Sequence, residues 1–343
     1  MGEDCLNLNL FTPGLGSGNR AVMVWLHGGG FFGGSGNWLL YDGTNLARQE
    51  EVVMVSITHR LNLFGFLHLA DLGGDKWANS SNMGMQDIVA ALNWIQENIA
   101  AFGGNPGNVT VFGHSGGGSK ATTPMAMPSA KGLIHRARTP RATTEQFLGK
   151  LGLKANELDR LQQFSWKQLQ DVYFSEPRIQ GLAGGPVVDG RTLPRDPWYR
   201  DAPAVSAEVP LMAGSSEIEG ASMDPPPPLQ MSEDEMLTKV RAIVGKDDAK
   251  ARQVVALYRM THAGISNTDV WLTMIADNAY RANAQLLNEL KTVQGKAPSY
   301  LYYFAWRSPV HKGQMKAFHG LDIPFALYNV DEAASMTGAM QER

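Results

Sequence analysis

The sequence predicts an α/β fold with a central, mostly parallel sheet and helices on both of its faces. Short apolar runs typical of buried strands alternate with segments of helical periodicity. Two of these runs lead directly into glycine-rich turns, His27-Gly28-Gly29-Gly30 and Gly113-His114-Ser115-Gly116-Gly117. The chain has 343 residues, of which 43% are hydrophobic, so it can bury a large core. These observations favour a single domain spanning residues 1–343.

The predicted elements follow one another in a β/α order. Apolar or alternating runs predict strands at 6–10, near a sheet edge, and at 22–26, 52–58, 109–112, 209–213 and 300–306. The clearest helix is expected at 86–101, because Ile88, Leu92, Ile95 and Ile99 recur at helical spacing before Gly103-Gly104. Further helices are expected at 143–174 and 233–290. They belong to two helical insertions over the active site, at about 138–205 and 221–295.

The pentapeptide around Ser115 fits the Gly-x-Ser-x-Gly pattern of a nucleophile elbow. In such an elbow a strand turns so sharply into a helix that the serine adopts a strained backbone conformation, and the glycines on either side avoid clashes. The preceding strand at 109–112 and the small residues that follow supply this context. An ordinary strand-to-helix turn is the alternative for the pattern taken alone.

A second motif strengthens the interpretation of Ser115 as a nucleophile. The loop His27-Gly28-Gly29-Gly30 follows the strand at 22–26. Loops of this kind supply backbone N–H groups to an oxyanion hole, and glycines let those groups approach a substrate oxygen. We expect Gly29, Gly30 and Gly116 to be the donors. A flexible β-turn is the alternative for the glycine triplet.

Taken together, these segments resemble the type-B carboxylesterase family, which also includes the cholinesterases, and bacterial members in particular. The resemblance implies an α/β-hydrolase fold and runs in the family's order over nearly the whole chain. It is carried by residues 3–9 (EDCLNLN), 25–36 (WLHGGGFFGGSG), 41–43 (YDG), 60–66 (RLNLFGF), 82–87 (NMGMQD), 98–118 (NIAAFGGNPGNVTVFGHSGGG), 214–220 (GSSEIEG) and 319–325 (HGLDIPF).

The resemblance also implies the other two members of a catalytic triad. The family's acid is the Glu before Gly in the segment at 214–220, which corresponds to Glu219, and its base corresponds to His319. The order Ser115, Glu219, His319 is that of α/β-hydrolases, and both new residues follow predicted strands. Glu217 and Asp224 remain local alternatives for the acid.

The chain departs from the family at several points. N- and C-terminal portions and a segment near 137–138 are missing relative to the family pattern. We expect that pieces present in relatives have been left out of the sequence at 137–138; a degraded or engineered scaffold is the alternative. His114 stands where many relatives have Glu, which removes a carboxylate beside the nucleophile.

The predicted reaction is hydrolysis of a neutral carboxylic ester by a serine esterase. An apolar pocket for the substrate is expected to be lined by Phe31, Phe32, Trp38, Met125 and Phe325. Two alternatives stay open: a non-catalytic binding or adhesion protein on the same fold, and a serine hydrolase acting on amides or thioesters.

Composition limits the partners that we expect. A formal net charge of −3 argues against nucleic acid, and no apolar run is long enough for a transmembrane helix. The motifs call for no metal and no organic cofactor. The polar first residues and the single cysteine favour a cytoplasmic or bacterial setting.

Overall fold

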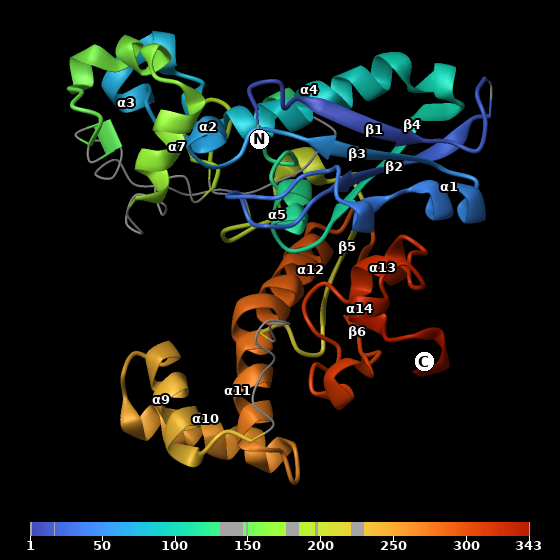
Figure 1. The fold of residues 1–343 in the computed structure, drawn as a ribbon, viewed down its shortest axis with the longest axis vertical. Coiled ribbons are helices and arrows are strands. Elements are labelled where there is room, and N and C mark those ends of the chain that lie inside the picture. The colour runs from blue at the N-terminus through green and yellow to red at the C-terminus, as the bar shows by residue number, and fades with distance from the viewer. Residues whose placement is uncertain are drawn as a thin grey trace. The chain divides into compact units, whose positions relative to one another are not determined.

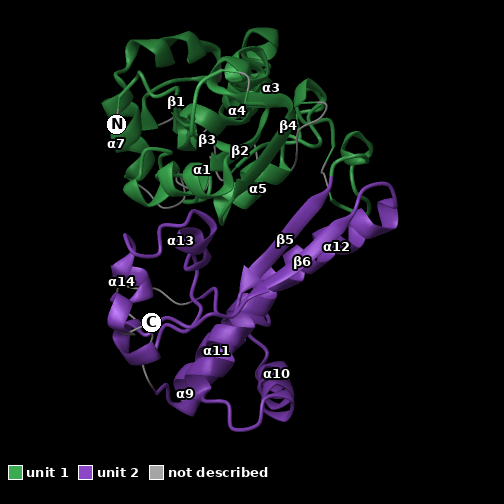
Figure 2. Cartoon of the chain, turned by 90° about the vertical axis from the view of Figure 1, so that its right-hand side faces the viewer, with its two compact units in different colours: residues 1–209 green, residues 210–343 purple. Residues whose placement is uncertain are grey.

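The computed structural model describes residues 2–16, 18–130, 147–148, 150–175, 185–195, 198–220 and 230–342. The chain forms two compact units, Met1–Val209 and Pro210–Arg343, which are coloured separately in Figure 2 and are described one at a time. The single-domain organisation stays a prediction. The departure near 137–138 and the alternative acid Asp224 lie outside the described residues.

Unit 1 contains a four-stranded sheet in the order β1-β3-β2-β4 (Figure 1). Its strands are β1 (Asn7–Phe11), β2 (Arg20–Leu26), β3 (Val53–Thr58) and β4 (Gly104–Gly113). Strand β2 runs parallel to both β3 and β4, whereas the edge strand β1 is antiparallel to β3. The prediction of a mostly parallel sheet with the first strand at its edge is confirmed.

The two central strands of this sheet are buried on both faces. Val24 and Val55 are partners in the β2–β3 register, and both are fully buried. On the neighbouring position of β2, Trp25 packs against Tyr41 and Phe112. Figure 1 shows α4 on one side of the sheet and α1 and α5 on the other. A parallel sheet covered on both faces needs continuous apolar strands, and this explains the runs in the sequence.

The helix predicted at 86–101 is α4 (Met83–Asn98), continued by a 3-10 turn at Ile99–Phe102. It begins three residues early because Met85 extends the buried stripe of Ile88 and Ile95. It ends at Gly103, whose φ of 83° is left-handed. Other α-helices in the described part of unit 1 are α1 (Thr44–Glu50), α2 (Asn62–Phe66), α3 (Ala70–Gly73), α5 (Gly116–Thr122) and α7 (Trp166–Phe174).

Unit 2 contains the parallel strands β5 (Leu211–Ser216) and β6 (Ser299–Phe304). Helix α12 lies alongside both strands (Figure 2). The helices expected at 233–290 are α9 (Glu233–Ile243), α10 (Asp248–Thr261), α11 (Asn267–Ala276) and α12 (Ala282–Gln294). Two short α-helices follow β6 in the described residues, α13 (Asp322–Ala326) and α14 (Ala334–Thr337). Among the residues that the structure describes, none of the helices has the length and apolar character needed to span a bilayer.

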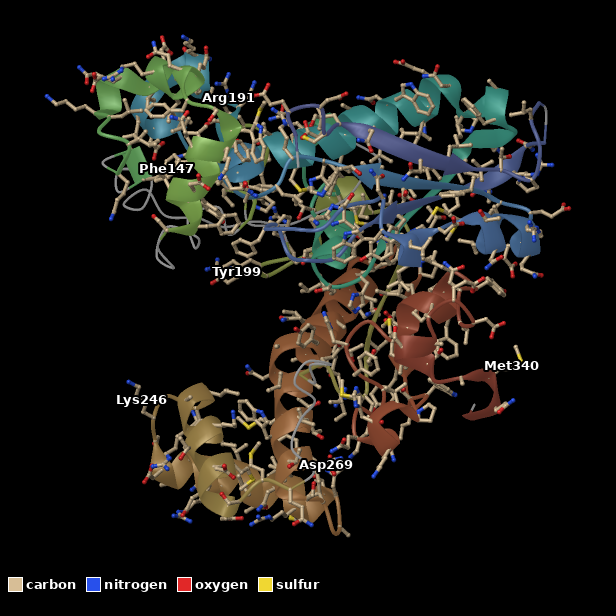
Figure 3. The ribbon with its side chains drawn as sticks, viewed as in Figure 1. Phe147, Arg191, Tyr199, Lys246, Asp269 and Met340 are labelled. Atoms are coloured by element: carbon tan, nitrogen blue, oxygen red, sulfur yellow. The ribbon has the colours of Figure 1, made fainter. Side chains whose placement is uncertain are left out.

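Side-chain capping sets the first residue of several helices in unit 2. The Ser232 side chain accepts from the Glu235 backbone N–H, and the Glu235 carboxylate accepts in return from the Ser232 backbone N–H, which is a capping box. Helix α11 begins after Ser266, whose hydroxyl accepts from Asp269. Asp269, labelled in Figure 3, also pairs with Lys316.

Candidate active site

Ser115 occupies the turn between β4 and α5 in a strained backbone conformation. It is the N-cap of α5, with φ 58° and ψ −122°, a combination that residues with a side chain rarely adopt. Two glycines make the turn possible. A Cβ atom on Gly113 or on Gly117 would overlap the carbonyl oxygen of Leu26. The Gly-x-Ser-x-Gly pattern is therefore required by the close packing of this turn against β2.

The glycine loop after β2 lies against the same turn. Gly29 and Gly30 have φ angles of 85° and 59°, in the left-handed region that favours glycine. A Cβ atom on Gly116 would overlap the backbone of Gly30, so the two residues are in direct backbone contact. Within the described part of the chain, the backbone N–H groups of Gly29, Gly30 and Gly116 donate to no acceptor. Unpaired backbone donors of this kind can bind a negatively charged oxygen.

Asn62 fixes the far end of the glycine loop. Its backbone N–H donates to the carbonyl of Phe31 at 2.7 Å, and its side-chain amide donates to the carbonyl of Phe32 at 3.3 Å. Asn62 has a φ of 49° and is buried. No role for Asn62 was predicted from the sequence. The available signal was its residue type, because Asn tolerates left-handed backbone better than most residues.

Unit 2 carries an acid–base pair on the segments that follow its two strands. Glu219 follows β5, and its Oε2 lies 2.5 Å from Nδ1 of His319, which follows β6. The other carboxylate oxygen accepts from the backbone N–H of Ser216 at 2.6 Å. Glu219 is buried, whereas His319 is partly exposed. With Nδ1–H donated to the carboxylate, Nε2 of His319 is left as the basic nitrogen.

The local alternative Glu217 has a different partner. Its carboxylate accepts from Nε and Nη2 of Arg307, at 2.9 and 2.5 Å. Both of its oxygens therefore serve an ion pair with Arg307. Of these two carboxylates, the structure brings only Glu219 to His319.

Two further groups face the acid–base pair, and the sequence analysis did not identify either. The Tyr280 ring packs on His319 with 5.1 Å between ring centroids. Asp322 begins α13 three residues after His319. Burial, reinforced by the negative charge of Glu219, raises the pKa of Asp322 to about 6.

A model of the carboxylesterase family matches residues 1–341. The chain belongs to the carboxylesterase family. It is similar to the para-nitrobenzyl esterase of Bacillus subtilis (strain 168), with 37% identity over 98% of this chain and 70% of the relative. It is also similar to the phenmedipham hydrolase of Pseudarthrobacter oxydans, with 31% identity over 96% of this chain and 67% of the relative. The chain is therefore a carboxylic ester hydrolase, as predicted.

Solved esterase structures resemble the whole chain. The carboxylesterase EST55 of Geobacillus stearothermophilus has a TM-score of 0.79 and 33% identity, and the match covers 96% of this chain and 70% of that one. A structure of PNB esterase has a TM-score of 0.77 and 33% identity, over 99% and 70% of the two chains. The predicted α/β-hydrolase fold is confirmed.

The residues expected to line a substrate pocket have different environments in the esterase. In unit 1, Met125 is buried, Phe31 is half-buried against Phe66, and Phe32 and Trp38 are exposed. In unit 2, the Phe325 ring packs against Phe304 and Trp306. These five positions stay a prediction as a substrate pocket.

A cavity of about 480 Å³ in unit 1 is lined by none of the predicted pocket residues. Arg191, labelled in Figure 3, His68 and Asp71 are among its lining residues. His68 joins Ser81 through Nδ1 and Asp71 through Nε2, at 2.6 and 3.2 Å. This row has the residue types of a triad, but the Ser81 side chain is fully buried and cannot meet a substrate. It is a structural network that holds the chain around His68.

Proposed function

We propose that Ser115, His319 and Glu219 form the catalytic triad of a serine esterase that hydrolyses neutral carboxylic esters. The observation that carries the proposal is the strained turn at Ser115 together with the unpaired backbone donors beside it. A turn that only connected a strand to a helix would not need a strained serine next to three free N–H groups. The Glu219–His319 pair supports the proposal by supplying an imidazole whose orientation is fixed by a carboxylate.

The proposed reaction has two steps. Oγ of Ser115 attacks the ester carbonyl while Nε2 of His319 takes the hydroxyl proton, and Glu219 stabilises the imidazolium that forms. The N–H groups of Gly29, Gly30 and Gly116 bind the oxyanion of the tetrahedral intermediate. The imidazolium then protonates the leaving alcohol. Water, deprotonated by the same imidazole, releases the acid and restores Ser115.

The comparisons favour this proposal over the two alternatives from the sequence. Relatives that match nearly the whole chain are named as esterases, which argues against a binding or adhesion protein. Amides and thioesters would use the same residues, so the leaving group must be tested directly.

The test combines turnover with covalent labelling. We expect the protein to hydrolyse p-nitrophenyl esters of several acyl lengths faster than the matching anilides. A fluorophosphonate should add its mass to the peptide that contains Ser115 and to no other. Ser115→Ala should abolish both turnover and labelling, since the nucleophile is lost.

Ser119→Ala is the matched control, because Ser119 lies on the same helix and is exposed. It should keep both turnover and labelling. Turnover that persists in Ser115→Ala, or label on another residue, would contradict the proposal.

A further inference from the structure

Lys120 is fully buried on helix α5, five residues after Ser115. A lysine is rarely found without solvent contact, because removing an ammonium group from water is unfavourable unless a partner compensates for the lost hydration. Among the described residues, Lys291 in unit 2 is the only other lysine that is fully buried. The position of Lys120 therefore calls for an explanation beyond the packing of α5.

The contacts of Lys120 lie at both ends of the glycine loop. Its Nζ donates to the carbonyl oxygen of His27 at 3.0 Å. The same Nζ lies 5.9 Å from the centroid of the Phe31 ring, within the range of a cation–π interaction. His27 and Phe31 are the residues immediately before and after Gly28-Gly29-Gly30. One amine thus contacts both ends of the segment that carries the unpaired N–H groups.

Among the described residues, the groups that contact Lys120 offer it no negative charge. His27 at the end of β2 and His59 after β3 stack with 5.0 Å between ring centroids. Burial lowers the pKa of His27 to about 4 and that of His59 well below its usual value, so both rings are neutral. Their Nδ1 atoms lie 2.8 and 2.9 Å from the backbone carbonyls of Gly28 and Arg60. The partners of Lys120 are thus the carbonyl of His27 at 3.0 Å, the Nδ1 of the same residue at 3.5 Å and the face of the Phe31 ring. These neutral groups compensate only partly for the hydration that an ammonium group loses on burial.

We propose that Lys120 is a positioning residue of the oxyanion hole, holding the glycine loop to the helix that carries the nucleophile. The inference rests on the proposed function of Ser115. The N–H groups of Gly29 and Gly30 sit on the loop, and that of Gly116 sits on α5. All three stabilise one oxygen only if the loop and the helix keep a fixed spacing. Lys120 fixes this spacing through its contacts with His27 and Phe31, without contacting the substrate.

The experiment replaces Lys120 with Met, which has a similar length but no N–H group. Because the oxyanion forms only in the transition state, kcat for a p-nitrophenyl ester should fall at least about tenfold while KM changes little. The inhibition constant of a trifluoromethyl ketone, whose bound form is an oxyanion, should rise by the same factor. Fluorophosphonate titration of Ser115 counts the competent molecules in each sample.

Lys120→Gln is the second variant, since it keeps N–H donors on a shorter, uncharged side chain. Its kcat should lie between the kcat of Lys120→Met and that of the unaltered protein. Lys291→Met is the matched control, because it removes the other buried lysine, on α12, and it should leave kcat unchanged.

The outcomes separate this inference from the proposed function. An unaltered protein that neither turns over esters nor labels at Ser115 would contradict the proposed function itself. If the unaltered protein is active, a folded Lys120→Met variant with normal kcat would overturn the role of Lys120 alone. Failure of both Lys120 variants to fold would also overturn it, because the lysine would then serve the fold and not the loop.

Discussion

Ile218 and Phe318 form an isolated parallel β-bridge beyond the ends of β5 and β6, and the backbone N–H of Ile218 donates to the carbonyl of Ala317 at 2.9 Å. The next residue on each segment is a member of the acid–base pair. The β5–β6 register ends with Ser216 opposite Phe304, so the bridge is a separate pairing that forms after the chain loops out between Phe304 and Phe318. The alignment of Glu219 and His319 therefore depends on this second backbone pairing as well as on their own hydrogen bond.

The identity of the acid is tested by exchanging each glutamate for glutamine. Glu219→Gln should lower kcat at least about 10²-fold, because the amide can neither stabilise the imidazolium nor fix the same tautomer. Glu217→Gln should change kcat little, since Glu217 engages Arg307. Steady-state kinetics of the two variants on one ester decide between them. A larger loss in Glu217→Gln would mean that the family alignment in this loop is shifted.

The oxyanion hole is tested by the space around two glycines of one loop. A Cβ on Gly29 would lie 2.5 Å from the carbonyl oxygen of Gly33, and Gly29 has a positive φ. Gly29→Ala should displace the loop and reduce kcat by up to the ~10²–10³ typical of one lost oxyanion donor. Gly33→Ala is the control, because a Cβ there meets no atom within 4 Å. Equal rates in the two folded variants would place the donors elsewhere.

Substitution of Asp322 should change how stability depends on pH. The pKa of this carboxyl is raised to about 6, so in the folded state it resists ionisation. Its contribution to the free energy of unfolding is thus most favourable at low pH and is lost as the pH rises from about 4 to 6. Asp322→Asn should therefore stabilise the protein by about 3 kcal/mol at pH 7 and by much less at pH 4. Urea unfolding at both pH values measures the difference; equal effects would contradict it.

Lys120 should produce the opposite trend in a more alkaline range. Burial lowers the pKa of this amine to about 7, so the unfolded chain binds more protons than the folded one above that pH. The free energy of unfolding should rise by about 2 kcal/mol between pH 7 and 9 from this group. The rise should be absent in Lys120→Met. Denaturant unfolding of both proteins across this range is the measurement, and parallel curves would be evidence against a titrating Lys120.

Local patterns predicted the elements and much of the chemistry. The apolar runs predicted β2, β3 and β4 to within a few residues. Strands of a parallel sheet that is covered on both faces are generally continuous apolar runs, and this makes them recognisable in a sequence. The turn at Ser115 was predictable because its glycines are required by contacts with the adjacent strand. The Glu219–His319 pair came from the family motifs and not from spacing.

The residues that support the site could not be predicted in this way. The roles of Asn62 and Lys120 depend on their contacts with the glycine loop. Both residues are distant from this loop in the sequence, so no local pattern indicates the contacts. The same holds for the environment of Asp322, which is set by its burial and by the charge of Glu219 on a segment distant in the sequence. The exposure of Phe32 and Trp38 could not be predicted from the sequence either, since hydrophobic residues are not confined to the protein interior.

The β5–β6 ladder has a consequence for how such proteins diversify. The chain leaves β5 at Ser216 and returns to pair with it at Ser299, and the register ends with Ser216 opposite Phe304. Insertions or deletions in the helices between these points change the length of an excursion whose two ends are already fixed. The excursion can lengthen, shorten or acquire new surfaces while the acid and the base keep their alignment. An insertion of one residue between Phe318 and His319, by contrast, would separate the base from the Ile218–Phe318 bridge and move it out of line with Glu219.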